Sequence, residues 1–253
     1  MLTYYQTQTS RLLQNPAAPT TLYSTTDLNS YINTARGQVA GEGRCVRRIG
    51  SLAITTGTRI YAFSAITGLG TETQGAIHIR NVAYSSGTGQ LYVPPLSFEY
   101  FWVYNLNNAA PVNGPPVAWA QFGQGSASTG SITGEGSGTI ISGSIYVDPP
   151  PDQSYTLKCD CVCYPAALAA DTDVEAIPYL WTDAVPYYAA YMALMSSQTG
   201  ARIQQAQALF QLYETFMQRA RNYANPDVLG VQYSQGPNPA RLADVPAPAR
   251  AAQ

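Results

Sequence analysis

Charged side chains are scarce in this sequence. They make up 11% of its 253 residues, against about 25% in an ordinary soluble domain. Lys158 is the only lysine among thirteen basic residues, and the net charge is -2. A sequence-independent nucleic-acid binder needs a basic face, so the composition disfavours that class. A neutral or acidic surface that DNA slides past is compatible with it.

Long apolar runs and targeting signals are also missing. No stretch approaches the length of a membrane span. The opening MLTYYQTQTSRLLQNP lacks the basic stretch and following apolar run of a secretory signal. We therefore expect a protein that is made in a cytosol, stays soluble until it assembles and has no membrane partner.

Catalytic groupings are equally hard to find. His78 is the only histidine, and no Cys–His or Ser–His–Asp set can be assigned around it. Gly134, Gly136 and Gly138 lack the third-glycine spacing and the following helix of a dinucleotide loop, and no GK[ST] phosphate loop is present. The sequence therefore predicts a protein that is no enzyme and needs no cofactor.

Two sets of residues resemble metal ligands only superficially. Cys159, Cys161 and Cys163 alternate along a strand pattern, whereas zinc sites pair Cys-x-x-Cys turns, so we expect these cysteines in the core. Asp148 and Asp152 flank a proline turn, where Asp is common for backbone reasons. The other carboxylates that could be placed around a metal are Asp160, Asp171 and Asp173. No metal site is predicted.

Tyrosine and arginine are what the chain has in excess. It contains 19 Tyr, and all but one of its basic residues are Arg. Both types are enriched at protein–protein interfaces, where Lys and Glu are depleted. The composition therefore favours a surface covered by partners. A genome-level bias against Lys codons would explain the arginine preference but not the tyrosine count.

Helical patterns lie at both ends of the chain. Residues 2–14 are predicted to form a short helix. A second helix begins at Ser24 or Thr25, as N-cap, and is expected to end at Gly41 and Gly43.

Near the other end, residues 183–197 follow a Thr182/Asp183 cap and form a third helix. Apolar residues then recur at spacings of three and four from Ile203 to Ala224. We expect an antiparallel helix hairpin here, with a coiled coil as the alternative.

In the middle of the chain, Gly, Pro and Asn separate short runs of residues typical of β-strands. The predicted strands are residues 52–56, 59–66, 76–84, 117–122, 139–147 and 154–163. The last two are joined by the proline turn 148–152. Residues 96–107 are expected to form a short helix whose aromatic side chains pack on the sheet.

Together these patterns predict an α+β protein. Residues 1–50 and 166–225 would form a helical bundle, and residues 51–165 a central antiparallel β domain. A flexible, exposed Gly/Ser loop is expected at 123–138. Residues 226–253 would form an extended C-terminal arm.

The arm is rich in Pro and Gly and contains a short apolar island. The island consists of Val228, Leu229, Val231 and Tyr233. Such an island in an extended segment suggests a part of the chain that orders on a partner. A frayed terminus is the alternative.

Several motifs follow one another in a recognisable order. They are RLLQNP ahead of LYSTTDLNSYINTARGQVAGEGRC, then GPPVAWAQFGQG, then SIYVDPPPDQSYTLKCDCVCYPAAL, then the closing IPYLWTDAVPYYAAYMALMSSQTGARIQQAQALFQLYETFMQRARNYANP. In this order, over residues 2–233, the chain resembles the head-to-tail adaptor (connector) proteins of tailed bacteriophages. The third motif is similar to that family's hairpin of two strands joined by a Pro-Pro-Asp turn. The insert at 123–138 departs from the pattern.

The resemblance implies a structural protein of the virion. It implies a homo-oligomeric ring, usually a dodecamer, that docks beneath the portal, joins the DNA-filled head to the tail and extends the DNA channel. Its partners would be the portal protein, nozzle or tube proteins of the tail, and DNA that passes without specific binding. The arm would reach the portal through Val228, Leu229, Val231 and Tyr233. Such a ring is assembled in the host cytoplasm and resides at the head–tail junction.

Three other functions are compatible with parts of the sequence. Another neck or tail ring is the nearest, although such proteins are often mostly β and the terminal helices count against it. A β-rich glycan-binding module would need exposed aromatic side chains, for which Trp102 or Trp119 could serve, whereas we expect both in the core. A peptidoglycan-cleaving enzyme is disfavoured by the missing catalytic groups.

Overall fold

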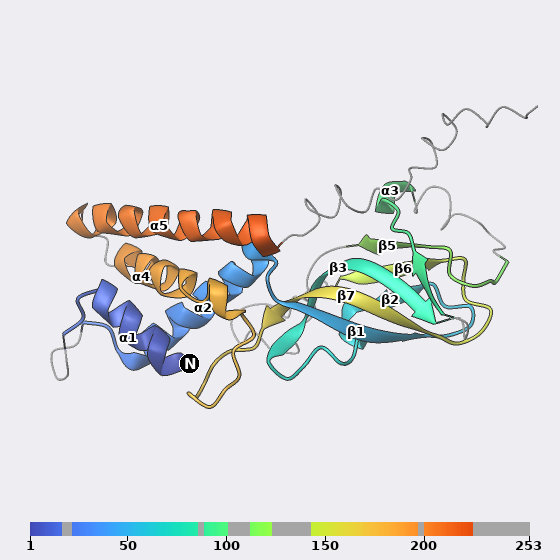
Figure 1. The fold of residues 1–253 in the computed structure, drawn as a ribbon, viewed down its shortest axis with the longest axis horizontal. Coiled ribbons are helices and arrows are strands. Elements are labelled where there is room, and N and C mark those ends of the chain that lie inside the picture. Colours follow the sequence, from blue (N-terminus) through green and yellow to red (C-terminus); the bar gives the residue numbers. More distant parts are fainter. Residues whose placement is uncertain (17–21, 86–88, 101–111, 123–142, 197–199, 225–253) are drawn as a thin grey trace, which may run out of the picture.

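Helices and sheets occupy opposite ends of the molecule, as seen in a computed structural model of the chain (Figure 1). The structure describes residues 1–16, 22–85, 89–100, 112–122, 143–196 and 200–224. Within these ranges all strand pairs of the two sheets are antiparallel. The predicted α+β class with antiparallel strands is therefore confirmed. Residues 123–138 and 226–253, for which a flexible loop and an arm were predicted, lie outside the described ranges.

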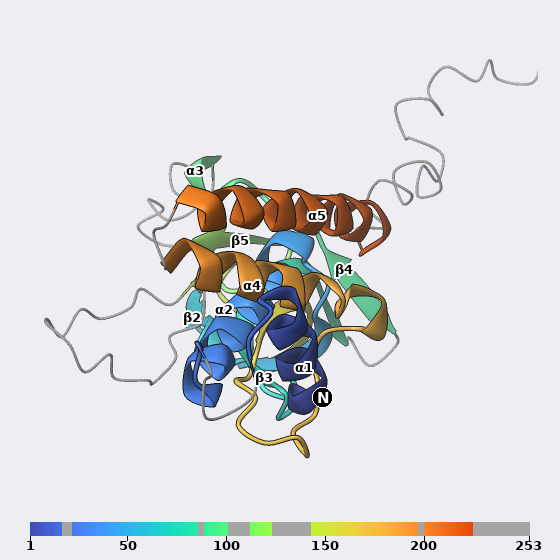
Figure 2. The ribbon, with the colours of Figure 1, turned by 90° about the vertical axis from the view of Figure 1, so that its left-hand side faces the viewer.

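The helical end contains four long helices. They are α1 (Leu2–Leu12), α2 (Thr25–Gly43), α4 (Ala184–Ser196) and α5 (Gly200–Ala224). Helix α4 packs against the other three and lies among them (Figure 2). Its buried residues are mostly small, which lets the neighbouring helices approach closely, and a helix that is apolar on all sides is stable only when surrounded.

Helices α4 and α5 form the predicted antiparallel hairpin. Residue numbers rise along α4 while those of their partners fall along α5. Ring pairs along this seam are Tyr187–Phe216, Tyr188–Tyr213 and Tyr191–Phe210, with centroids 5.3, 4.7 and 5.0 Å apart. Tyr213 and Met217 of the predicted apolar stripe are fully buried.

The start of α2 follows the sequence prediction, and its end follows it at Gly43 but not at Gly41. Ser24 accepts a hydrogen bond from the Asp27 backbone N–H at 3.1 Å, and Asp27 accepts one from the Ser24 N–H, which completes a capping box. The helix ends at Gly43, but Gly41 lies inside it, and the left-handed residue is Arg44 (φ 48°). Gly43 instead provides space, because a Cβ there would lie 3.2 Å from the Met217 methyl group of α5.

The predicted Thr182/Asp183 cap of α4 has other partners in the structure. The Thr182 hydroxyl donates to the Tyr179 carbonyl at 2.8 Å, and the Asp183 carboxylate accepts from the Tyr4 hydroxyl at 3.0 Å. These two side chains therefore join the start of α4 to the preceding turn and to α1.

Two sheets form the other end of the molecule. The four-stranded sheet has the order β1 (Arg47–Ile54), β7 (Tyr155–Pro165), β3 (Thr73–Ser85), β4 (Gln90–Val93). The three-stranded sheet has the order β2 (Ile60–Ala62), β6 (Ser144–Asp148), β5 (Ala118–Phe122). Inward side chains of both sheets and of the four long helices belong to one continuous hydrophobic core.

Several strand boundaries differ from the prediction. β1 begins at Arg47 rather than residue 52, because its ladder with β7 already starts at Arg47, opposite Val162. The side chains of Arg47 and Arg48 form ion pairs with Asp160 and Glu72. Residues 63–65 form a 3-10 turn instead of continuing a strand. β4 was not predicted, and residues 139–142 lie outside the described ranges.

Of the helix predicted at 96–107, only the short α3 (Phe98–Tyr100) is described, because residues 101–111 lie outside. The Phe98 ring packs on those of Phe122 and Tyr146, with centroids 4.5 and 5.2 Å apart. The expected packing of an aromatic residue on the sheet is thus confirmed at Phe98.

The expected hairpin around the proline turn 148–152 is wrong. β6 and β7 belong to different sheets, so the turn carries the chain from one sheet to the other. Proline has no N–H to extend a ladder. The Pro150 and Pro151 carbonyls instead accept hydrogen bonds from the Gly114 and Gly57 N–H groups, both at 2.9 Å.

Candidate functional site

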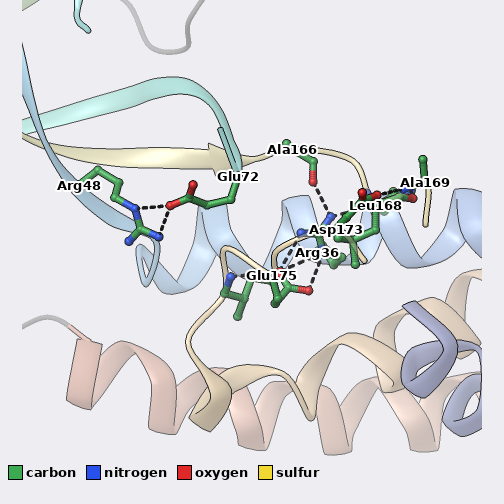
Figure 3. A network of polar contacts seen from close by, with 10 residues as sticks. Arg36, Arg48, Glu72, Ala166, Leu168, Ala169, Asp173 and Glu175 are labelled. Atoms are coloured by element: carbon green, nitrogen blue, oxygen red, sulfur yellow. Dashed lines mark hydrogen bonds and ion pairs between the residues drawn. The ribbon is translucent and has the colours of Figure 1, made fainter. Parts of the chain in front are cut away.

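A buried polar junction fixes the helices to the segment that follows β7 (Figure 3). Arg36 of α2 is fully buried and donates to Glu175 through Nε and Nη2, with shortest distances of 3.0 and 2.7 Å. Its Nη1 donates to the Ala166 carbonyl at 2.6 Å. Asn33, one turn earlier, donates to the Leu168 carbonyl at 3.0 Å and accepts from the Leu168 N–H at 2.8 Å.

This junction keeps two buried charges satisfied. The Glu175 carboxylate also accepts the Ile177 N–H at 3.0 Å. A buried charge is tolerated when it is paired and its remaining polar atoms find hydrogen bonds, and removal of one partner is strongly destabilising. We infer that residues 166–177 are held firmly against α2.

Two carboxylates of the same segment close its loop. Asp173 accepts the N–H groups of Ala170 and Ala169, and these bonds lower the pKa of its carboxyl. Asp171 accepts from the terminal ammonium of Met1 at 2.5 Å, which is the main reason that its pKa is also lowered. Asp171 is exposed, so solvent screens its ion pair with Met1.

The segment then turns and exposes large apolar side chains. In the 3-10 turn Tyr179–Trp181, Tyr179 is 82% and Leu180 is 75% exposed. The turn is held by a hydrogen bond from the Trp181 N–H to the Pro178 carbonyl at 2.9 Å and by the Thr182 hydroxyl described above. We call Tyr179 and Leu180 the apolar turn.

A second exposed apolar surface lies on the four-stranded sheet, on the side away from the core. It is a groove of about 300 Å³ that we call the sheet groove, lined by Ile49, Asn81, Ala83, Tyr92, Lys158 and Asp160. Ile49 is 72% and Tyr92 61% exposed. Exposed apolar side chains that gather in one place often mark an interface.

One basic and one acidic side chain, Lys158 and Asp160, line the sheet groove. Asp160 is neutralised by its ion pair with Arg47. The Lys158 ammonium donates to the Ser51 hydroxyl at 2.7 Å, and among the described residues no carboxylate lies within ion-pair distance of it. The groove therefore carries one unneutralised positive charge.

The residues predicted to bind the portal cannot be placed. Val228, Leu229, Val231 and Tyr233 all lie outside the described ranges. The apolar turn and the sheet groove were not found from the sequence. Pro178 bounds the turn in the sequence, but no local pattern says that the residues after it face solvent.

Two of the aromatic and histidine candidates, Trp119 and His78, lie on described strands. Trp119 is buried and its Nε1 donates to the Val93 carbonyl at 3.0 Å, so the expectation of core packing is confirmed for it. Trp102 lies outside the described ranges. His78 is half-buried in β3, opposite Val162 of β7.

The three cysteines that were predicted to lie in the core do so. Cys159, Cys161 and Cys163 are fully buried along β7, and Cys45 is buried beside α2. Burial raises the pKa of Cys45 and of Cys159 to about 12 and that of Cys163 to about 11. The thiols are thus protonated at neutral pH and poor nucleophiles.

The remaining candidate carboxylates have protein partners. Asp148 pairs with Arg59 at 3.2 Å, and burial raises its pKa. Asp152 accepts from the Tyr155 hydroxyl at 2.6 Å. In the part of the chain that the structure describes, no three His, Cys, Asp or Glu side chains are grouped to hold a metal ion. Nor is any described helix both long enough and apolar enough to span a bilayer.

A protein family matches the part of the chain that contains both sheets and the helices. No curated protein matches the sequence. The family described as SU10 adaptor protein matches residues 5–238, a span that includes both sheets and nearly all of the helical end. We conclude that this chain belongs to the SU10 adaptor protein family.

Proposed function

We propose that the protein forms a ring beneath the portal of a tailed bacteriophage, joins the filled head to the tail and extends the DNA channel. Membership of the family makes the chain a structural adaptor protein of a phage, and such proteins are not usually enzymes. The observation that carries the proposal is the family match over residues 5–238. The resemblance to head-to-tail connectors supports the position at the junction and a dodecameric ring.

The surface of the protein agrees with repeated self-association. A closed ring needs two different faces on each subunit, because its contacts are heterologous. The apolar turn and the sheet groove are two such exposed surfaces on different elements. A net charge of -2 also suits a channel through which DNA passes without sticking.

We propose that residues 226–253 act as an arm separate from the helical part (1–50 and 166–225) and the β part (51–165), and that the arm contacts the portal. Its apolar island is Val228, Leu229, Val231 and Tyr233. In an otherwise polar, proline-rich segment these side chains are the ones with apolar area to bury on a partner.

The test is cosedimentation of the full chain, and of a variant that ends at residue 225, with portal rings of the same virus. The full chain is expected to cosediment and the truncated chain is not. A matched control keeps the full length of the chain and replaces only four residues by Ser: Val228, Leu229, Val231 and Tyr233. Full-strength portal binding by both variants would contradict the role of the arm. Failure of the full chain to bind portal, with binding to tail tube instead, would move the ring to another place in the neck or tail.

A further inference from the structure

We propose that the apolar turn of one copy of this chain seats in the sheet groove of the next copy, and that this is the repeated contact of the ring. The inference rests on the proposed function, since it names the surfaces through which that ring closes. The occupant of the sheet groove is thus a second copy of the chain, and the contact joins unlike surfaces.

The apolar turn has the properties of an insertion element. Tyr179 and Leu180 are adjacent, large and mostly exposed, and the hydrogen bonds around Trp181 and Thr182 hold their backbone. The same segment is anchored to α2 through Glu175 and Arg36. A preorganised loop loses little conformational entropy on binding, so more of the apolar contact appears as affinity.

The sheet groove has the complementary shape and character. Ile49 and Tyr92 form exposed apolar walls on β1 and β4, and Ala83 and Asn81 of β3 lie between them. The volume of about 300 Å³ belongs to a recess in the four-stranded sheet, whose ladders fix its backbone and whose β3–β7 pairing shifts register between Ile79 and Asn81. Two apolar side chains that enter it remove from water both their own surface and that of the walls.

The charges around the two surfaces also favour the pairing of the apolar turn with the sheet groove. Residues 166–201 contain four carboxylates and no Lys or Arg. Asp171 and Glu175 are neutralised within the chain by the Met1 ammonium and by Arg36. Asp173 and Asp183 have no basic group within ion-pair distance among the described residues.

The turn side therefore keeps about two negative charges, counted from its two unpaired carboxylates, and the groove side keeps the positive charge of Lys158. Opposite charges guide the two surfaces into register and disfavour the like pairings, turn against turn and groove against groove. A head-to-tail contact repeats from copy to copy until the ring closes.

Cysteine cross-linking tests the pairing in the full-length protein. One variant carries Leu180→Cys, a second carries Tyr92→Cys, and a third carries both. Each is treated with a short bismaleimide, alone and bound to portal rings, and the products are separated on a denaturing gel. The four native thiols are buried and protonated, so the unmodified chain serves as the background.

A head-to-tail contact makes a specific prediction for this set. The double variant is expected to give a ladder of linked oligomers, whereas an equimolar mixture of the two single variants gives dimers and nothing larger. The matched control pairs Tyr92→Cys with Leu212→Cys, an exposed position on α5, and is expected to stay monomeric on the gel.

Each other result overturns the inference. Dimers from Leu180→Cys alone would show a turn-on-turn contact. Oligomers by light scattering without a cross-linked ladder would show that the ring uses other surfaces, and would leave the proposed function intact. Absence of any oligomer, alone or on portal rings, would contradict the proposed function and this contact together.

Discussion

The segment between β7 and α4 contains two regions that reverse the usual distribution of side chains. At one region, Glu175 forms with Arg36 the most deeply buried ion pair among the described residues. A few residues later, Tyr179 and Leu180 are among the most exposed apolar side chains that the structure describes. Charge lies inside and apolar surface lies outside.

The two regions have different roles in the molecule. A buried pair contributes little net stability but tolerates little change, since each charge depends on the other. Exposed apolar side chains contribute almost nothing to the fold of a single copy and become favourable when a partner covers them. The first region therefore fixes the position of the segment, and the second uses that position for contact.

The largest expected effect comes from breaking the buried pair. Arg36→Ala leaves the Glu175 carboxylate without its counter-ion and the Ala166 carbonyl without its donor. We expect a loss of about 3–5 kcal/mol in the free energy of unfolding, measured by denaturant titration.

The matched control for this variant removes both charges. Arg36→Met combined with Glu175→Leu leaves no uncompensated ion, so its loss is expected to be clearly smaller. A double variant as unstable as Arg36→Ala would show that the charges themselves are not what the junction needs.

Asn33→Ala is expected to have an intermediate effect. It removes the donor and the acceptor that pair with the backbone of Leu168, at 3.0 and 2.8 Å. Partly buried backbone groups that lose their partners cost about 1–3 kcal/mol. Thermal unfolding measures the change, with the exposed Asn81→Ala of the sheet groove as the control. Equal melting temperatures for the two variants would contradict the role of Asn33.

Acid is expected to weaken the segment that follows β7 and the Arg48–Glu72 ion pair. The pKa values of Asp171, Asp173 and Glu72 are lowered in the folded chain, from ordinary values of 3.8, 3.8 and 4.5. Their stabilising contribution is fully present above those ordinary values and is lost as the pH falls through the lower folded ones. Burial raises the pKa of Asp148, which acts in the opposite direction.

The measurement is the melting temperature between pH 6 and pH 3, for the unmodified chain and for Asp173→Asn. The unmodified chain is expected to lose stability steadily towards pH 3. The variant is expected to have a lower melting temperature at pH 6, and this temperature should fall less steeply towards pH 3. If the melting temperature changed equally with pH in both proteins, Asp173 would titrate alike in the folded and unfolded chain.

The smallest effect on the fold is expected at the apolar turn. Tyr179→Ser combined with Leu180→Ser removes exposed side chains, so the free energy of unfolding should stay within about 0.5 kcal/mol per substitution. Self-association is nevertheless expected to be lost, as measured by sedimentation velocity with portal rings. Val174→Ser, at a nearby exposed position, serves as the control and should associate normally. A destabilised turn variant would place these residues in the fold rather than at an interface.

Local patterns in the sequence predicted the helices well. Capping chemistry at Ser24 and apolar periodicity along α5 act over a few residues, so they can be read without knowledge of the rest of the chain. The alternation of the cysteines in β7 is equally local, and it correctly indicated burial.

Pairing between distant residues could not be predicted in this way. The partner of Arg36 lies 139 residues further along the chain, so an arginine beside the apolar stripe of α2 gave no indication of where its carboxylate would be. The separation of β6 and β7 into two sheets depends on contacts of the proline turn with Gly57 and Gly114. The exposure of Tyr179 and Leu180 is likewise a property of the whole fold, since their sequence is as apolar as that of a core segment.

We propose above that many copies of this chain assemble on a portal. The most direct test is the mass of the complex formed with portal rings, measured by light scattering after size exclusion. We expect one species with a fixed number of copies per portal ring, twelve by the resemblance to head-to-tail connectors. A chain that elutes as a monomer beside unchanged portal rings would contradict it.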